Sequence, residues 1–326
     1  MTKEKCLLQV KDLKVHFAVP EGLVRAVDGI TFDVPAGKTL ALVGESGCGK
    51  TVTSLSLLRL LKVPPAIISA EVIDFNGIDL GSLNKEEIRK IRGKEIAMIF
   101  QEPMTSLNPV FRISRQMREV YKNHSSLAKA EIDSACIDML EKVGIPDAKN
   151  KFKAFPHELS GGLRQRIMIA MALASKPKLL IADEPTTALD VTIQAQILLL
   201  LKSLSVENKM SVLLITHDFG VVADIADQVA VMYAGKIVES GPLEAVLYSP
   251  LHPYTEALIR SIPGLKTRRG ERLKTIKGMV PNPLLLQPGC RFAPRCEYAD
   301  EHCYQQEPLT ELIDNRTIAC FKWRRS

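Results

Sequence analysis

The sequence predicts an α/β fold organised around a nucleotide-binding loop. The first observation is the segment GESGCGKT at residues 44–51, whose spacing of glycine, four residues, glycine, lysine and threonine is the phosphate-loop pattern. The second is its setting, between the apolar run TLALV at 39–43 and a leucine-rich segment at 52–61. The third is a pair of further apolar runs, 95–100 and 178–184, that end in polar residues as buried strands of such folds do.

Each part of the loop has a chemical reason. Its three glycines let the backbone curl and turn N–H groups inward, and the following helix adds the positive end of its dipole. Lys50 can reach the β- and γ-phosphates of a nucleotide, and the Thr51 hydroxyl can bind Mg²⁺. A plain glycine-rich turn is disfavoured because strand, loop and helix occur in the required order. Cys48 stands at a variable position, and no role is expected for its side chain.

Composition narrows the class of protein. The 326 residues, 46% hydrophobic and 25% charged, suffice for one large or two modest domains. The first residues show no secretory signal, and no apolar run reaches the roughly 18 residues that cross a bilayer. A transport role would therefore need separate membrane chains. The net charge of +6 and the 5% aromatic content do not indicate a nucleic-acid partner.

Hydrophobic periodicity predicts the elements of the chain. Strands are expected at 7–17, 26–34, 39–43, 72–75, 95–100, 178–184, 211–216, 229–233 and 236–239. Helices are expected at 52–61, 85–91, 112–123, 129–143, 160–174, 191–204 and 248–261. Residues from about 102 to 172 form a helical insert between the strands of the core. Beyond Pro263, a basic run at 266–277 and a proline-rich stretch at 281–288 indicate a linker into a small module. A solvated charged face is favoured for the basic run over contact with anionic lipid.

Polar side chains end three of the predicted strands. Asp183 follows four apolar residues, as a Mg²⁺-holding residue would, and Glu184 beside it is placed to polarise an attacking water. Gln101 could hold a metal ligand or a water, and His217 could sense a γ-phosphate. The common alternative is a solvated strand end for the two acids, a simple loop start for Gln101 and a structural role for His217. The phosphate loop elsewhere in the chain favours the functional interpretation of the two acids.

The segment LSGGLRQR at 159–166 predicts a second helix N-terminus that is suited to binding phosphate. Ser160 is a good N-cap, while Gly161 and Gly162 leave backbone N–H groups bare. Glycine inside a helix costs about 1 kcal/mol relative to alanine, so the pair needs a reason, and close approach of a ligand is one. Phe17, at the end of the first strand, is equally compatible with stacking on adenine and with an ordinary core position.

Together, GESGCGKT, Gln101, LSGGLRQR, LLIADE, ALD at 188–190 and His217 closely resemble the nucleotide-binding subunits of ABC transporters. The resemblance implies a RecA-like P-loop core with an antiparallel β subdomain, an inserted helical subdomain, and ATP with Mg²⁺. The implied catalytic residues are Glu184, His217 and Gln101. The implied nucleotide-binding residues are Phe17, Gly44, Glu45, Ser46, Gly47, Cys48, Gly49, Lys50, Thr51, Val52, Ser160, Gly161, Gly162 and Asp183. Thr51 and Gln101 would lie at Mg²⁺, and Asp190 in a dimer-contacting loop.

A finer resemblance lies toward the two ends. VRAVDGITFDV, QEPMTSLNP, SPLHPYTEALIRSIP and PGCRFAPRC are similar to segments of the dipeptide/oligopeptide importers, and the chain resembles their D-type ATPase. This implies a nucleotide-binding domain at 1–263 and a C-terminal extension at 264–326.

The resemblance also implies partners and a place in the cell. The expected partners are a second ATP-binding subunit, favoured as a paralogue, two transmembrane permeases and, indirectly, an extracytoplasmic peptide-binding protein. The chain would lie peripherally on the cytoplasmic face of the membrane. An importer ATPase for nickel or another small solute, a soluble non-transport ABC ATPase, and a redox-sensing regulatory subunit remain alternatives.

Four of the seven cysteines cluster in the C-terminal 37 residues of the chain, a pattern that indicates reduced thiols or a metal site. They are Cys290, Cys296, Cys303 and Cys320, separated by five, six and sixteen residues. This spacing favours a metal without naming it, so zinc, an iron–sulfur cluster and unliganded thiols stay open. The resemblance to the peptide importers implies a 4Fe–4S cluster, which would staple a module too small for a large core.

Overall fold

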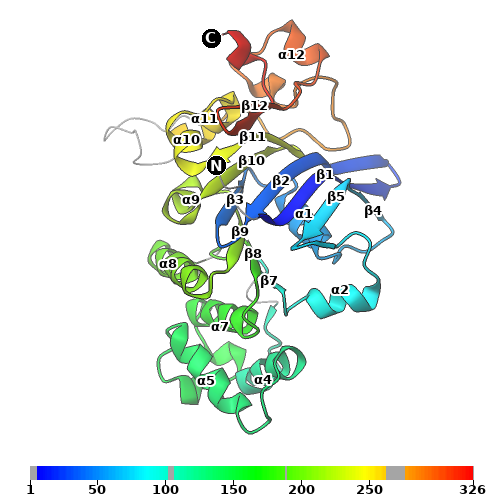
Figure 1. Cartoon of the computed structure of the whole chain (residues 1–326). Helices are drawn as coiled ribbons and strands as arrows, with labels where there is room; N and C mark the ends of the chain where they lie inside the picture. Colours follow the sequence, from blue (N-terminus) through cyan, green and yellow to red (C-terminus); the bar gives the residue numbers. More distant parts are fainter. Residues whose placement is uncertain (1–5, 102–105, 188, 262–275, 326) are drawn as a thin grey trace. The chain divides into compact units, whose positions relative to one another are not determined.

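The structure is a computed structural model that describes residues 6–101, 106–187, 189–261 and 276–325 (Figure 1). The chain divides into two compact units, Met1–Ser82 with Leu214–Ser326, and Leu83–Leu213. Strand β9 (Ser211–Thr216) carries the chain from the second unit back into the first.

The first unit contains most of the strands and both chain ends. Its elements before the second unit are β1 (Cys6–Val19), β2 (Gly22–Pro35), β3 (Thr39–Val43), α1 (Lys50–Leu57), β4 (Ala66–Ser69), β5 (Val72–Phe75) and β6 (Ile78–Asp79). Those after it are α9 (Phe219–Ile225), β10 (Gln228–Tyr233), β11 (Lys236–Pro242), α10 (Leu243–Tyr248), α11 (Pro253–Arg260), the 3-10 turn η2 (Ala293–Arg295), α12 (Glu301–Gln305), β12 (Glu311–Ile313), β13 (Arg316–Ile318) and η3 (Lys322–Arg325).

An antiparallel sheet forms one layer of this unit. Strand β1 pairs with β2 over nearly its whole length, and β4 and β5 pair with its other edge. The side chains of Leu8, Val10, Leu13 and Val15 in β1 are fully buried, as the hydrophobic pattern of the strand predicts. The predicted strands at 7–17 and 26–34 are thus confirmed, each longer than expected.

A second sheet in the same unit carries the nucleotide-binding loop. Its strands run in the order β12-β13-β11-β10-β3, with β10 parallel to β3 and antiparallel to β11. The C-terminal strand β13 pairs with β11, and its Ile318 is fully buried. The described part of the C-terminal extension therefore continues the core sheet. The predicted boundary at 263/264 lies in residues 262–275, outside the described part of the chain.

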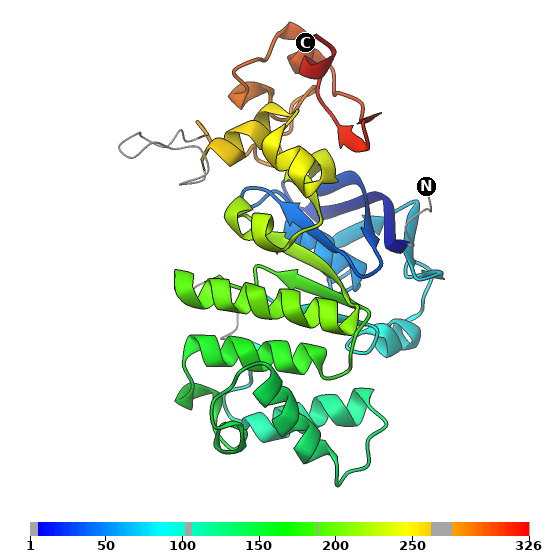
Figure 2. The same ribbon diagram turned by 60° about the vertical axis from the view of Figure 1, so that its left-hand side comes forward.

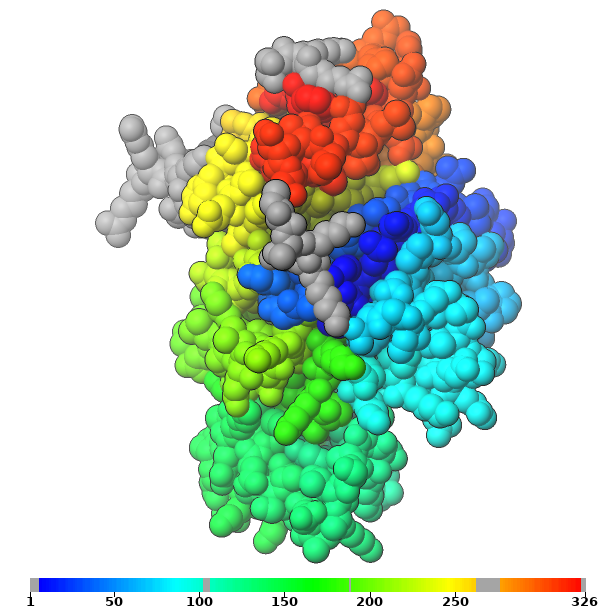
Figure 3. All heavy atoms as spheres, viewed as in Figure 1, coloured from blue at the N-terminus to red at the C-terminus, as the bar shows by residue number. Residues whose placement is uncertain are grey.

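The extension also contributes to the hydrophobic core of the first unit. Phe292 is buried, with its ring centroid 5.2 Å from that of Tyr233 and 5.3 Å from that of Tyr254. Figure 3 shows the C-terminal residues, in orange and red, packed against the yellow helices α10 and α11. Burial of aromatic rings in this cluster fixes the extension to the strand that borders β3.

The second unit is mainly helical. Its elements are α2 (Lys85–Ile91), β7 (Ile96–Ile99), α4 (Ile113–His124), α5 (Ile132–Lys142), α6 (Ala148–Lys151), the 3-10 turn η1 (Pro156–Glu158), α7 (Gly161–Leu173), β8 (Leu179–Asp183) and α8 (Val191–Asn208). Strands β7 and β8 pair in parallel, and α7 and α8 run side by side in Figures 1 and 2. Ile113, Met117 and Tyr121 bury one stripe of α4 against its neighbours, as the amphipathic pattern predicts.

One predicted helix starts too early. Of the helix expected at 248–261, the structure forms α11 at Pro253–Arg260, whereas Tyr248 is the last residue of the preceding helix α10 and Ser249–His252 are not helical. Pro253 lacks an N–H and takes the first position of α11, while His252 caps the helix by accepting the Tyr254 N–H at 3.0 Å. The basic run at 266–277 lies almost wholly in the undescribed segment 262–275.

Within the described ranges, no helix is both long and apolar enough to span a bilayer.

The aromatic cluster predicts a strong dependence of stability on Phe292. Replacing Phe292 by alanine removes a buried ring and leaves a cavity, so it should lower the free energy of unfolding by about 3–5 kcal/mol. Thermal unfolding of purified protein measures the change. Leu285→Ala, at a side chain that is 70% exposed, is the matched control and should leave the midpoint nearly unchanged. Equal midpoints for the two variants would contradict the packing role of Phe292.

Candidate functional site

Two backbone carbonyls of the first unit lie in close contact with the phosphate loop. A Cβ atom on Gly44 would lie 2.1 Å from the Met232 carbonyl oxygen of β10, and one on Gly49 would lie 2.3 Å from that of Ala26 in β2. Gly49 also has a φ of 106°, a conformation that side-chain-bearing residues rarely adopt. Only glycine fits at these two positions, so the glycine spacing follows from the packing of the loop.

Lys50 lies inside the curl of the loop. Its buried ammonium donates to the carbonyl oxygens of Gly44 and Glu45, at 2.7 and 3.0 Å. Helix α1 starts at Lys50 without a side-chain cap, so the loop joins a buried cation to a bare helix start, the combination that seats a phosphate. Cys48 is buried, and burial raises the pKa of its thiol, as expected for a packing residue.

Glu45, within the loop, is held from outside it. Its backbone N–H donates to the Tyr254 hydroxyl at 2.9 Å. Its carboxylate accepts two hydrogen bonds from the Arg295 guanidinium, at 2.6 and 2.9 Å. Sequence reasoning did not identify Tyr254 or Arg295, because no spacing pattern links either residue to a loop more than 200 positions away.

In the second unit, three polar residues meet at the end of β8. The Glu184 carboxylate accepts hydrogen bonds from the Gln101 amide at 3.2 Å and the Thr187 hydroxyl at 2.9 Å. Asp183, the last residue of β8, is buried, and Glu184 follows with a φ of 45°. The backbone therefore turns sharply at Glu184 and directs its carboxylate toward Gln101. Thr187 was missed because a threonine in a loop carries no pattern of its own.

The start of α7 lies at the surface of the second unit. Ser160 and Gly161 are exposed, and the Ser160 hydroxyl accepts from the Leu163 N–H at 3.4 Å. A Cβ atom on Gly162 would lie 3.0 Å from Ile193 of α8. The packing of the two helices therefore already explains Gly162. For Gly161, whose nearest neighbour would be Leu189 at an ordinary 3.7 Å, packing gives no such reason.

The remaining predicted residues divide between the units. Phe17 is half-buried in β1, opposite Val24 of β2. His217 is exposed directly after β9 in the first unit. In the second unit, Asp190 caps α8 by accepting the Ile193 N–H at 2.9 Å. Ala188, the first residue of the predicted ALD segment, lies outside the described residues.

The four C-terminal cysteines line one cavity of about 230 Å³ in the first unit. In the described part of the chain, no three histidine, cysteine, aspartate or glutamate side chains converge closely enough to hold a single metal ion. Burial, with neighbouring cysteines adding to it, raises the pKa of Cys290 to about 11. Burial likewise raises the pKa of Cys296 and of Cys320. Without a bound metal, these thiols are protonated at neutral pH.

His252 lies at the wall of the same cavity. Its ring is fully buried, and burial lowers its pKa to about 3, so the ring is neutral. Because Nδ1 accepts the Tyr254 N–H, the ring proton belongs on Nε2, and among the described residues Nε2 has no hydrogen-bond partner. The wall of the four-cysteine cavity thus includes a buried neutral imidazole whose Nε2–H has no partner among the described residues.

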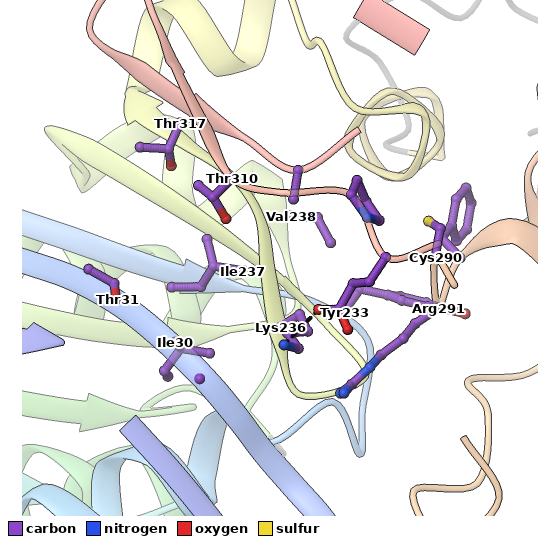
Figure 4. Close-up of a pocket in the computed structure, with 15 residues that line it drawn as sticks. Ile30, Thr31, Tyr233, Lys236, Ile237, Val238, Cys290, Arg291, Thr310 and Thr317 are labelled. Carbon is purple, nitrogen blue, oxygen red and sulfur yellow. Dashed lines mark ion pairs between the residues drawn. The ribbon is translucent and has the colours of Figure 1, made fainter. Parts of the chain in front are cut away.

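A neighbouring cavity of about 310 Å³ lies where the cysteine-bearing segment meets β2 and β11 (Figure 4). From Cys290 onward the chain follows its wall, and Arg291 extends to the Ala234 carbonyl at the β10–β11 turn and to Asp28 of β2. Burial alone would raise the pKa of Asp28, but Arg291, with Lys236 and His16, holds it below its usual value. The segment is therefore anchored to the core on both sides of Phe292.

Comparisons with known proteins agree with this geometry. Residues 27–187 match the ABC transporter family, and residues 238–303 match the oligopeptide/dipeptide transporter C-terminal region. The chain is 49% identical over 97% of its length to the oligopeptide transport ATP-binding protein OppD of Escherichia coli, covering 93% of that protein. It is likewise 49% identical to AppD of Bacillus subtilis, covering 97% of this chain and 96% of AppD.

Solved structures give the same fold. The ATP-binding cassette MJ0796, in a dimeric post-hydrolysis state bound to ADP and Pi, has a TM-score of 0.64 at 25% identity over 72% of this chain and 98% of its own. The cbiO1 protein of Clostridium perfringens has a TM-score of 0.63 at 27% identity, over 76% of this chain and 92% of its own. The predicted ABC-type P-loop fold is confirmed, and the chain is an ATPase that belongs to the ATP-binding proteins of the oligopeptide/dipeptide ABC transporters.

Proposed function

We propose that this chain is the D-type ATPase subunit that powers import of di- and oligopeptides by a multi-subunit ABC transporter. The observation that carries the proposal is the 49% identity to OppD over 97% of the chain, which includes the cysteine-bearing extension. The separate match of residues 238–303 to the oligopeptide/dipeptide transporter C-terminal region supports the same substrate class over nickel or another solute.

In the proposed mechanism, Glu184 is the group that polarises the attacking water. The hydrogen bonds from Gln101 and Thr187 stabilise its ionised carboxylate and fix its direction. Lys50 and the N–H groups of the phosphate loop would bind the β- and γ-phosphates, and His217 would sense the γ-phosphate. Phe17 would stack on the adenine. Thr51, Gln101 and Asp183 would hold Mg²⁺, which neutralises phosphate charge when bound.

The exposed start of α7 supports an ATP sandwich. Ser160, Gly161 and Gly162 would bind the γ-phosphate held by the opposite subunit, and Asp190 would lie near the shared interface. The related MJ0796 cassette is dimeric in its ADP- and Pi-bound state, which supports this arrangement. We propose a paralogous ATPase as the partner and two transmembrane permeases as the docking site. An extracytoplasmic peptide-binding protein would supply the substrate, and the chain would act at the cytoplasmic face of the membrane.

The role of Glu184 predicts the behaviour of Glu184→Gln. The amide keeps the hydrogen-bonding shape but cannot polarise water as a carboxylate does, so ATP should still bind while turnover falls by roughly 10²-fold or more. Steady-state phosphate release and retention of labelled ATP measure the two effects. Glu207→Gln is the matched control, because Glu207 pairs with Lys142 on the surface of α8. Near wild-type turnover in Glu184→Gln would remove Glu184 from this role.

The transported substrate is tested by uptake in a strain of the native host that lacks this gene. The wild-type chain should restore uptake of a labelled tripeptide, and Glu184→Gln should fail to do so. Uptake of labelled nickel should be the same with and without the gene. Restoration of nickel uptake without peptide uptake would instead identify a nickel importer and contradict the proposal.

We further propose that the four-cysteine cavity holds a 4Fe–4S cluster. The four thiols that line this one cavity match in number the four thiolate ligands that such a cluster takes. The Nε2–H of His252, which has no partner in the described part of the chain, is a suitable donor to such a group. Because the thiols bind as thiolates, loading the cavity would release their protons to solvent.

Anaerobically purified protein should therefore contain about four irons and four acid-labile sulfides per chain. Cys290→Ser or Cys320→Ser should lose both, because each removes a thiol from the cavity wall. Cys6→Ser is the control, since Cys6 lies in β1 away from the cavity lining, and it should retain the full content. Stoichiometric zinc, or no metal under anaerobic handling, would contradict the cluster and leave the ATPase assignment intact.

A further inference from the structure

The segment between Cys290 and Cys296 reaches the phosphate loop. Arg295, in the turn η2, places both ends of its guanidinium on the Glu45 carboxylate, with N–O distances of 2.6 and 2.9 Å. The Arg295 side chain is only 5% exposed, and that of Glu45 is 28% exposed. A bidentate ion pair of this kind, shielded from water, fixes the geometry of both partners.

The environment of Arg295 holds the guanidinium in place. Besides Glu45, it donates to the Tyr233 hydroxyl at 3.3 Å and to the carbonyl oxygens of Lys277 and Gly278, at 2.8 and 3.3 Å. The hydrogen bond to Glu45 raises the pKa of Arg295 further, so its positive charge is permanent. The pair is therefore a fixed anchor between the C-terminal segment and the loop.

The charge of Glu45 makes this anchor relevant to nucleotide binding. Glu45 is the second residue of a loop whose ligand is a polyphosphate, and its carboxylate would repel that ligand. The Arg295 guanidinium compensates the charge of this carboxylate, while the Lys50 ammonium is engaged by the backbone carbonyls of Gly44 and Glu45. The Tyr254 hydroxyl fixes the Glu45 backbone at the same time.

Both anchors of Glu45 adjoin the cysteine cavity. Arg295 immediately precedes Cys296, which lines the cavity. The Tyr254 N–H donates to Nδ1 of His252, which lines the same cavity. Two short paths thus run from the cavity wall to one residue of the phosphate loop.

We propose that Arg295 is a positioning residue for the phosphate loop, through which the cysteine-bearing segment sets the affinity of the site for ATP. Arg295 acts through Glu45 and does not itself touch the nucleotide. The C-terminal segment then serves as a part of the nucleotide site.

The test is a calorimetric titration of the full-length protein with ATP in the absence of Mg²⁺. Arg295→Met should raise the Kd about tenfold, because it leaves the Glu45 carboxylate uncompensated beside the phosphates. Arg295→Lys keeps the charge but loses the bidentate geometry, so the Kd of this variant for ATP should rise only about threefold. Arg316→Met is the matched control, because Arg316 also ties the extension to the core, through the carbonyls of Ala245 and Ser249. Its Kd should stay within about twofold of wild type.

A double-mutant cycle separates positioning from general stability. In a Glu45→Gln background the carboxylate charge is gone, so Arg295→Met should change the Kd by less than about twofold. Thermal unfolding of each variant is measured alongside, and if Arg295→Met does not fold, Arg295→Lys with and without Glu45→Gln completes the same cycle. The proposal is overturned if Arg295 variants bind ATP like wild type, if Arg316→Met weakens ATP binding equally, or if the Arg295 effect persists without the Glu45 carboxylate.

Discussion

The close approach of two backbone carbonyls to the phosphate loop constrains the geometry of the nucleotide site. Gly44 faces the Met232 carbonyl and Gly49 faces that of Ala26, at distances that admit no side chain. This close packing makes the loop curl around the Lys50 ammonium, and it fixes the residue at which α1 begins. Met232 lies in β10, which pairs in parallel with β3, so the sheet order itself sets the width available to the loop. The C-terminal segment packs against β10, so it also influences the geometry of the phosphate loop.

The sequence predicts the parts of this molecule that obey local rules. Buried strands such as β3 and β9 are recognisable because their apolar runs end at polar residues or turns, and the glycine spacing of the loop reports its curl directly. The sequence also predicts part of the hydrogen-bonded cluster at Glu184, since Gln101 and Glu184 come after the ends of the paired strands β7 and β8. Helix α8 extends four residues beyond its predicted end, to Asn208, and it ends where Lys209 takes the left-handed conformation.

The failures have a common physical origin in tertiary packing. Strand β4 and the hairpin of β12 and β13 are too short to show a hydrophobic period, and they form because β1 and β11 offer edges to pair with. The later start of α11 depends on Glu239, which is buried in β11 and whose carboxylate accepts the N–H groups of Leu251 and His252 at 2.9 Å each. The contacts of Glu45 with Tyr254 and Arg295 join residues far apart in sequence and leave no periodic trace.

The hairpin of β12 and β13 also changes what the core sheet exposes. Without it, β11 would be the last strand of the sheet in the first unit, seven residues long, with its outer N–H and C=O groups unpaired. A long open edge of this kind invites pairing with other chains. Strand β13 covers part of that edge, and the new border strand β12 has only three residues and begins with a charged side chain, Glu311. Removing the extension would therefore expose an unpaired edge strand and would also remove Arg295, which holds the Glu45 carboxylate. A chain shortened to the ATP-binding fold alone would tend to self-associate through that edge.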